Sequence, residues 1–141
     1  MSFSLAITTA EEIVVTERAA LLTDLANIRW KHEVGGLTLP GGVEVRSDRE
    51  TRAALTEAVN WLSNGLMQAP IAWKMAAGWT DLSQQDLEAI TAAVSAHVQA
   101  SFAAERTVQA QIEAQDDLTD FDLQTAFEEA LAALLRKSPD G

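Results

Sequence analysis

Residues 29–50, RWKHEVGGLTLPGGVEVRSDRE, contain a helix end, a β-hairpin and a new helix start in immediate succession. A link of one proline and two glycines, Pro40-Gly41-Gly42, joins two short alternations of apolar and polar residues. The proline fixes φ at a negative value, and the glycines accept the positive φ that such links usually need. The alternation places its apolar side chains on one face, in the pairs Leu37 with Val45 and Leu39 with Val43. The stretch therefore predicts a small rigid corner around which the rest of the chain folds.

Glycines and capping residues mark the ends of the neighbouring elements. Gly35-Gly36 is expected to end the preceding helix, because glycine tolerates the left-handed conformation of a helix end. Ser47 and Glu50 form a capping box that predicts the start of the next helix. Residues 71–75 then alternate in polarity, Ala76-Ala77-Gly78 turns the chain, and a return strand follows, which predicts a second hairpin. The predicted turn residues are Gly35, Gly36, Pro40, Gly41, Gly42 and Gly78.

Apolar residues three and four positions apart predict the helices. The first covers residues 10–33 and the second residues 48–66. The third starts after the capping pair Ser83 and Asp86 and runs for about thirty residues, and the fourth covers residues 119–137. The predicted fold class is α+β and mainly α-helical, with about four helices and two short β-hairpins that form a small antiparallel sheet.

We expect a single domain, because 141 residues can bury a core without disulfides or metals. Residues 1–9 are expected to form an N-terminal arm or a short strand. Residues 10–114 are expected to form a helix-hairpin-helix-hairpin-helix domain, and residues 115–137 a C-terminal amphipathic helix of the same domain.

Composition narrows the range of partners. There is no cysteine, which excludes disulfides, thiolate metal ligands and cysteine nucleophiles. The 21 acidic and 10 basic residues give a formal net charge of −11, which opposes broad contact with nucleic acid or anionic membranes. The N-terminus does not resemble a signal peptide, and no apolar run approaches the roughly 20 residues that span a bilayer. We expect no nucleic-acid partner, no membrane partner and a location in the cytoplasm.

No residue pattern points to catalysis. His32 and His97 are the only histidines, and neither has an acid or a second histidine at the spacing of a recognised motif, so both are interpreted as structural. Adjacent acids such as Asp116-Asp117 are typical of helix starts and solvated faces. Glycine motifs for phosphate binding or a nucleophile elbow do not occur. We expect no enzyme activity, no catalytic residue, no cofactor and no metal.

Tryptophans and clustered arginines could form a ligand site, but local packing explains both groups more simply. Aromatic residues at these spacings favour core positions over a ligand cage. The arginines could bind an anion, yet Asp48 and Glu50 lie among them, which favours local ion pairs. The tryptophans are Trp30, Trp61, Trp73 and Trp79, and the arginines are Arg46, Arg49 and Arg52.

Four blocks of the sequence resemble a small bacteriophage family of unknown function. These blocks are RWKHEVGGLTL, VEVRSDRET, WKMAAGWTDL and AHVQASFAAER. The family is found among tail genes, often beside tail-fibre and tail-fibre-assembly genes, and the resemblance covers roughly residues 25–106. Its pattern often has cysteine where this chain has Ser101. The residues that carry the resemblance are Arg29, Trp30, Glu33, Gly35, Gly36, Asp48, Arg49, Trp73, Lys74, Gly78, Trp79, His97, Val98, Gln99 and Phe102.

The resemblance implies a non-enzymatic role in a phage tail, either as a structural component near the tail fibre or baseplate or as a tail-fibre assembly chaperone. It implies a tail or tail-fibre protein as partner, and a location in the host cytoplasm during assembly or in the virion tail. Alanines along the third helix would also allow self-association. An alternative is an acidic phage-encoded inhibitor of a host nucleic-acid-processing protein. The candidate partner contacts are Phe3, Leu5, Ile7, Phe121, Phe127, Leu131 and Leu134.

Overall fold

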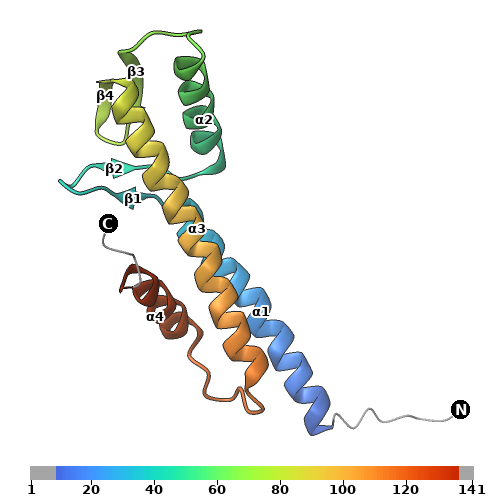
Figure 1. Cartoon of the computed structure of the whole chain (residues 1–141). Helices are drawn as coiled ribbons and strands as arrows, with labels where there is room; N and C mark the ends of the chain where they lie inside the picture. The colour runs from blue at the N-terminus through green and yellow to red at the C-terminus, as the bar shows by residue number, and fades with distance from the viewer. Residues whose placement is uncertain (1–8, 137–141) are drawn as a thin grey trace, which may run out of the picture. The chain divides into compact units, whose positions relative to one another are not determined.

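Helices and short hairpins alternate along the chain in the computed structural model, which describes residues 9–136 (Figure 1). The predicted α+β, mainly helical fold class is confirmed. The candidate contacts Phe3, Leu5 and Ile7 lie outside the described residues. The elements are α1 (Ala10–Val34), β1 (Leu37–Thr38), β2 (Glu44–Val45), α2 (Arg49–Ser63), β3 (Ile71–Met75), β4 (Gly78–Leu82), α3 (Gln84–Ala114) and α4 (Leu123–Arg136).

The chain divides into two compact units. Of the described residues, the first contains 9–29 and 103–136, and the second contains Trp30–Phe102. Each unit has its own cluster of buried apolar side chains. The long helices α1 and α3 contribute residues to both units, and all of α4 belongs to the first.

The core of the first unit is built from α1, α3 and α4. Its buried residues recur at helical spacing, as in Ala104, Val108 and Ile112 of α3, because one stripe of each helix faces the others. An ion pair of 3.0 Å between Arg29 Nε and Glu105 Oε1 joins α1 to α3 beside this core. The buried residues are Leu25, Ala104, Val108, Ile112, Leu118, Leu123, Phe127 and Ala130.

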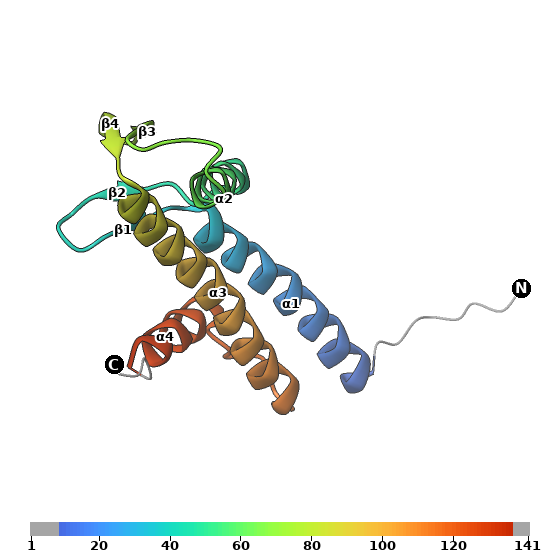
Figure 2. The same cartoon turned by 45° about the horizontal axis from the view of Figure 1, so that its top comes forward.

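The core of the second unit lies among α2, the hairpins and the first half of α3. Strand β4 leads directly into α3 (Figure 2), so Leu82 and Leu87 enter the same core from adjoining elements. The buried residues are Val45, Leu55, Ala58, Leu62, Leu82, Leu87, Ile90 and Val94.

The first hairpin has the predicted register. Leu37 pairs with Val45, and the Leu39 amide donates to the Val43 carbonyl at 2.7 Å. Strand β3 pairs with β4 in the second hairpin, also antiparallel. Within residues 9–136 the hairpins form two separate two-stranded sheets, whereas we expected one joint sheet. Both hairpins instead bury apolar side chains against the helices of the second unit.

Capping residues fix the helix starts, in two cases later than expected. The predicted Ser83 and Asp86 box is present, with reciprocal hydrogen bonds of 3.0 and 3.1 Å. Helix α2 begins after Asp48 instead of Ser47, and α4 begins at Leu123 instead of Thr119. Asp122 accepts from the Thr125 amide at the start of α4, while Thr119 bonds to Asp117 in the preceding turn. In both cases an aspartate later in the sequence provides the cap.

Candidate functional site

A buried carboxylate joins the end of α1 to the start of α2. The side chain of Glu33 is 1% exposed. Its Oε2 accepts a hydrogen bond from Arg52 Nη2 at 2.9 Å and lies 3.6 Å from Arg49 Nε. A buried charge persists only when it is paired, so the two arginines stabilise the ionised form of Glu33.

This pairing corrects one expectation about the arginines. Arg46 does pair locally, with 3.3 Å between its Nε and Asp48 Oδ1. Arg49 and Arg52 instead pair with Glu33, which the sequence places on the preceding helix. The local ion pairs predicted for these two residues were wrong, because burial makes Glu33 a stronger partner than the exposed Glu50.

Ser47 holds the hairpin against the same helix end. Its fully buried hydroxyl donates to the Glu33 carbonyl at 2.7 Å and accepts from the Gly36 amide at 2.9 Å. The predicted capping role passes to Asp48, whose carboxylate accepts from the amide and the hydroxyl of Thr51 at 3.0 and 2.6 Å. The Thr51 hydroxyl, with smaller help from the Thr51 amide and Arg46, holds the pKa of Asp48 below its ordinary value despite opposing desolvation.

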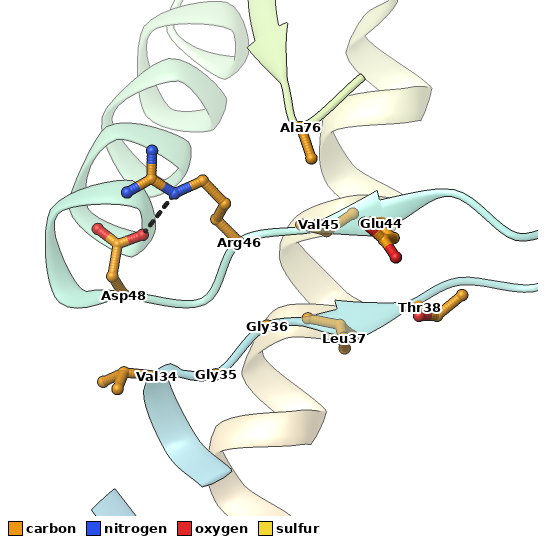
Figure 3. A pocket seen from close by; sticks show the side chains of 10 residues that line it. All are labelled: Val34, Gly35, Gly36, Leu37, Thr38, Glu44, Val45, Arg46, Asp48 and Ala76. Carbon is orange, nitrogen blue, oxygen red and sulfur yellow. Dashed lines mark ion pairs between the residues drawn. The ribbon is translucent and has the colours of Figure 1, made fainter. Parts of the chain in front are cut away.

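A pocket of about 390 Å³ opens beside this corner (Figure 3). It is lined by residues 34–38, by Glu44, Val45, Arg46 and Asp48, and by Ala76 of the second hairpin. Arg46 is the one basic residue among those that line it, and it is already paired with Asp48. The pocket therefore offers no unpaired positive charge to an anionic ligand.

His32 and His97, which are 65 positions apart, form a stacked pair. Their ring centroids are 4.5 Å apart and the rings are inclined by 26°. His97 Nε2 donates to the His32 carbonyl at 2.7 Å, and His32 Nδ1 lies 2.7 Å from the Ser101 hydroxyl. That hydroxyl donates to the His97 carbonyl, so His32 Nδ1 is the donor in the contact with Ser101. Burial, and secondly the charge of His97, lower the pKa of His32.

The histidine pair links α1 to α3 through two hydrogen bonds, from His97 Nε2 to the His32 carbonyl and from His32 Nδ1 to the Ser101 hydroxyl. Within residues 9–136 no group of three or more His, Asp and Glu side chains is placed to hold a metal ion. In the same part of the chain, no helix has the length and apolar character of a membrane span. The absence of catalytic, cofactor and metal residues stays a prediction.

The second hairpin carries Trp79, the most exposed of the four tryptophans. Trp79 is 73% exposed, and Lys74 Nζ lies 6.0 Å from the centroid of its ring. The register pairs Lys74 with Trp79 and Trp73 with Thr80. Trp73 therefore lies on the face packed against the core, and Trp79 lies on the opposite face.

A groove of about 530 Å³ runs beside Trp79. Apolar side chains from both hairpins and from α3 line it, and the charged residues of its lining are two carboxylates, Asp81 and Asp86. We call this the β4 groove. Its apolar lining includes Leu39, Val43, Met75, Trp79, Leu82 and Ile90.

The core positions predicted for the tryptophans were wrong for three of the four. Trp30, Trp61 and Trp79 are exposed, and only Trp73 packs against a core. The spacing of the tryptophans in the sequence does not distinguish buried from exposed positions. On a two-stranded sheet with one covered face, a shift of one residue decides whether a side chain is buried.

The partner contact predicted at Phe127 of α4 also needs correction. Phe127 is 2% exposed at the centre of the first unit's core, and Phe121, Leu131 and Leu134 pack against that core. Phe127 is therefore not available to a partner, whereas the other three side chains are partly buried and contribute to the core. Leu135, on the same helix, is the large apolar residue that remains exposed, at 78%.

The motif residues do not converge on one site. Glu33, Arg49 and Asp48 surround the helix–hairpin corner, His97 stacks on His32, and Lys74 and Trp79 lie on the second hairpin. Arg29 belongs to the ion pair of the first unit. Trp30 and Phe102 are exposed.

Comparison with known proteins identifies the family of the chain. A family model described as Domain of unknown function (DUF4376) matches residues 16–129. No curated protein and no solved structure matches the chain. Because the family model covers most of the sequence, the chain belongs to the DUF4376 family.

Proposed function

We propose that this chain is a non-enzymatic protein-interaction module of a bacteriophage tail. Its partner is a tail or tail-fibre protein, and it serves as a component near the fibre or baseplate or as a chaperone of fibre assembly. The phage setting rests on the sequence blocks that resemble a family found among tail genes.

The observation that carries the interaction role is the β4 groove with Trp79 at its rim. A tryptophan that is 73% exposed leaves a large apolar area in water. Tryptophan is enriched at the centres of protein interfaces, where its burial contributes strongly to affinity. Exposed Val43 lies in the same lining and enlarges the apolar area that a partner would cover.

The rest of the second unit supports a rigid docking role. Glu33, Ser47 and the histidine pair connect α1 to α2, to the first hairpin and to α3 with partly buried polar contacts. Such contacts hold the helices and the first hairpin in a fixed arrangement before a partner arrives, which lowers the entropic cost of binding.

Location in the particle tests this proposal. Mass spectrometry and immuno-electron microscopy of purified phage that carry this gene should find the protein at the tail in fixed stoichiometry if it is a component. Its absence from particles, together with loss of fibres when the gene is deleted, is the result expected of a chaperone. Particles that lack the protein and keep normal fibres after deletion would contradict the proposal.

A further inference from the structure

The outer edge of β4 is a free strand edge. In both views β3 lies on the side of β4 that faces α2 (Figures 1 and 2). Within residues 9–136, no backbone hydrogen bond from outside the β3–β4 hairpin reaches Gly78–Leu82. A free edge of this kind can pair with an added strand.

The register shows which backbone groups the edge presents. Only Ala76 and Ala77 separate Met75 from its partner Gly78, so this pair exchanges hydrogen bonds directly. Bonded and non-bonded pairs alternate along an antiparallel ladder. Trp79 and Asp81 are therefore in non-bonded positions, and their N–H and C=O groups point away from β3.

The groove beside this edge defines the side chains that an added strand would need. Side chains opposite Thr80 and Leu82 would face the apolar lining, which includes Leu39, Val43 and Ile90. Side chains opposite Trp79 and Asp81 would lie on the exposed face. The charged groups of the lining are carboxylates, so a basic side chain next to Asp81 is complementary to them.

We propose that the β4 edge binds an extended segment of the partner chain by strand addition, and that this segment alternates aliphatic residues with lysine or arginine. The backbone of Trp79 and Asp81 supplies the hydrogen bonds, the groove takes the aliphatic side chains, and Asp81 selects the basic ones. This mode rests on the proposed interaction function and specifies the chemistry of its partner.

A synthetic peptide with the sequence Val-Lys-Val-Lys-Val-Lys-Val, blocked at both ends, tests the proposal against the full chain by isothermal titration calorimetry. We expect saturable binding with one peptide per chain. The counterpart with glutamate in place of lysine should bind at least tenfold more weakly.

Matched variants distinguish binding at the β4 edge from binding through the overall negative charge of the protein. Asp81→Asn should weaken binding about fivefold, whereas Asp116→Asn, with the same change in charge, should leave it unchanged. Trp79→Ala should weaken binding about tenfold, and Trp61→Ala should not. Equal effects within either pair would overturn the proposal, since they would show binding by charge alone or outside the groove.

Methylation of the peptide backbone tests strand pairing directly. Two versions of the peptide carry N-methyl groups on alternate sets of residues, so each blocks one edge of the peptide. One version should lose binding and the other should retain it. Equal binding of both versions would overturn strand addition.

Two further results would overturn strand addition at β4 but would remain compatible with the proposed interaction function. One is a crosslink from position 79 to a tail or fibre chain when the peptide does not bind. The other is self-association of the chain that Trp79→Ala abolishes, because a second copy would then occupy the edge.

Discussion

Loss of Glu33 should strongly destabilise the second unit. Replacing Glu33 with Gln removes the charge that pairs with Arg52 and Arg49 and leaves the partly buried Arg52 without its carboxylate. Loss of one partner of a buried ion pair typically costs about 3 kcal/mol, so chemical denaturation should show a decrease near that size. The exposed Glu50→Gln is the control and should change the free energy of unfolding by less than about 0.5 kcal/mol. Equal effects of the two substitutions would contradict a role for the buried pair.

His32 makes stability depend on pH near neutrality. Its pKa in the folded protein is lower than the ordinary value of 6.5, first because of burial and then because of the charge of His97. The unfolded chain therefore binds the proton more readily, so the contribution is complete above pH 6.5 and is lost as the pH falls from there toward the folded pKa.

The thermal midpoint should therefore decrease as the pH is lowered from about 7.5 to 5.5, and it should decrease less in the His32→Gln variant. Asp48, Asp117 and Asp122 have lowered pKa values, so their contribution is lost only at more acidic pH, below their ordinary value of 3.8. A thermal midpoint with the same pH dependence in both proteins would contradict the assignment to His32.

For single residues, the sequence predicted the types of interaction better than it predicted which residues interact with each other. The capping box at Ser47 and Glu50 predicted a helix cap one residue before the observed cap, Asp48. Ser47 does not cap the helix, because it is fully buried and bonds to Gly36 and Glu33. The stack of His32 on His97 could not be inferred from spacing, because it depends on how α1 packs against α3. Interactions between distant residues arise from tertiary packing, which local patterns do not encode.

The hairpin between β1 and β2 depends on Gly36. Its φ is +86°, and a Cβ atom there would lie 3.0 Å from the Val45 carbonyl oxygen. Gly36→Ala should lower the free energy of unfolding by more than about 1–2 kcal/mol, because backbone strain and a close contact add. Gly41→Ala is the control, since its φ is +96° but nothing lies within 4 Å of the added atom. Equal losses for both would show that the Val45 contact is unimportant.

Helix α4 is held to the first unit by Phe127. Phe127→Ala should cost about 3–5 kcal/mol because it removes a ring from a packed core. Leu135→Ala, on the exposed side of the same helix, should change the free energy of unfolding by less than about 0.5 kcal/mol. Urea denaturation of the two variants checks the assignment. A small effect of Phe127→Ala would restore this residue as a candidate partner contact.

Elements were predictable where local chemistry determines them. Alternation around Pro40-Gly41-Gly42 identified the first hairpin with its register, and helical spacing identified all four described helices. The side of the second hairpin that Trp73 and Trp79 occupy was not predictable, because it depends on which face the helices cover. The same limit applies to α4, whose apolar stripe fits a core or a partner equally well.

At the scale of the whole molecule, the net charge and the β4 groove support the proposed binding role. A net charge of −11 disfavours nucleic acid, and the carboxylates at the β4 groove favour a basic partner segment.

A photo-crosslinking amino acid at position 79, introduced during phage infection, tests the central claim most directly. The same amino acid at position 61, another exposed tryptophan position, is the matched control. We predict that position 79 forms a discrete adduct with one tail or tail-fibre protein and that position 61 does not. A chain that crosslinks to no tail or fibre protein from position 79, while it remains folded, would contradict the proposed function.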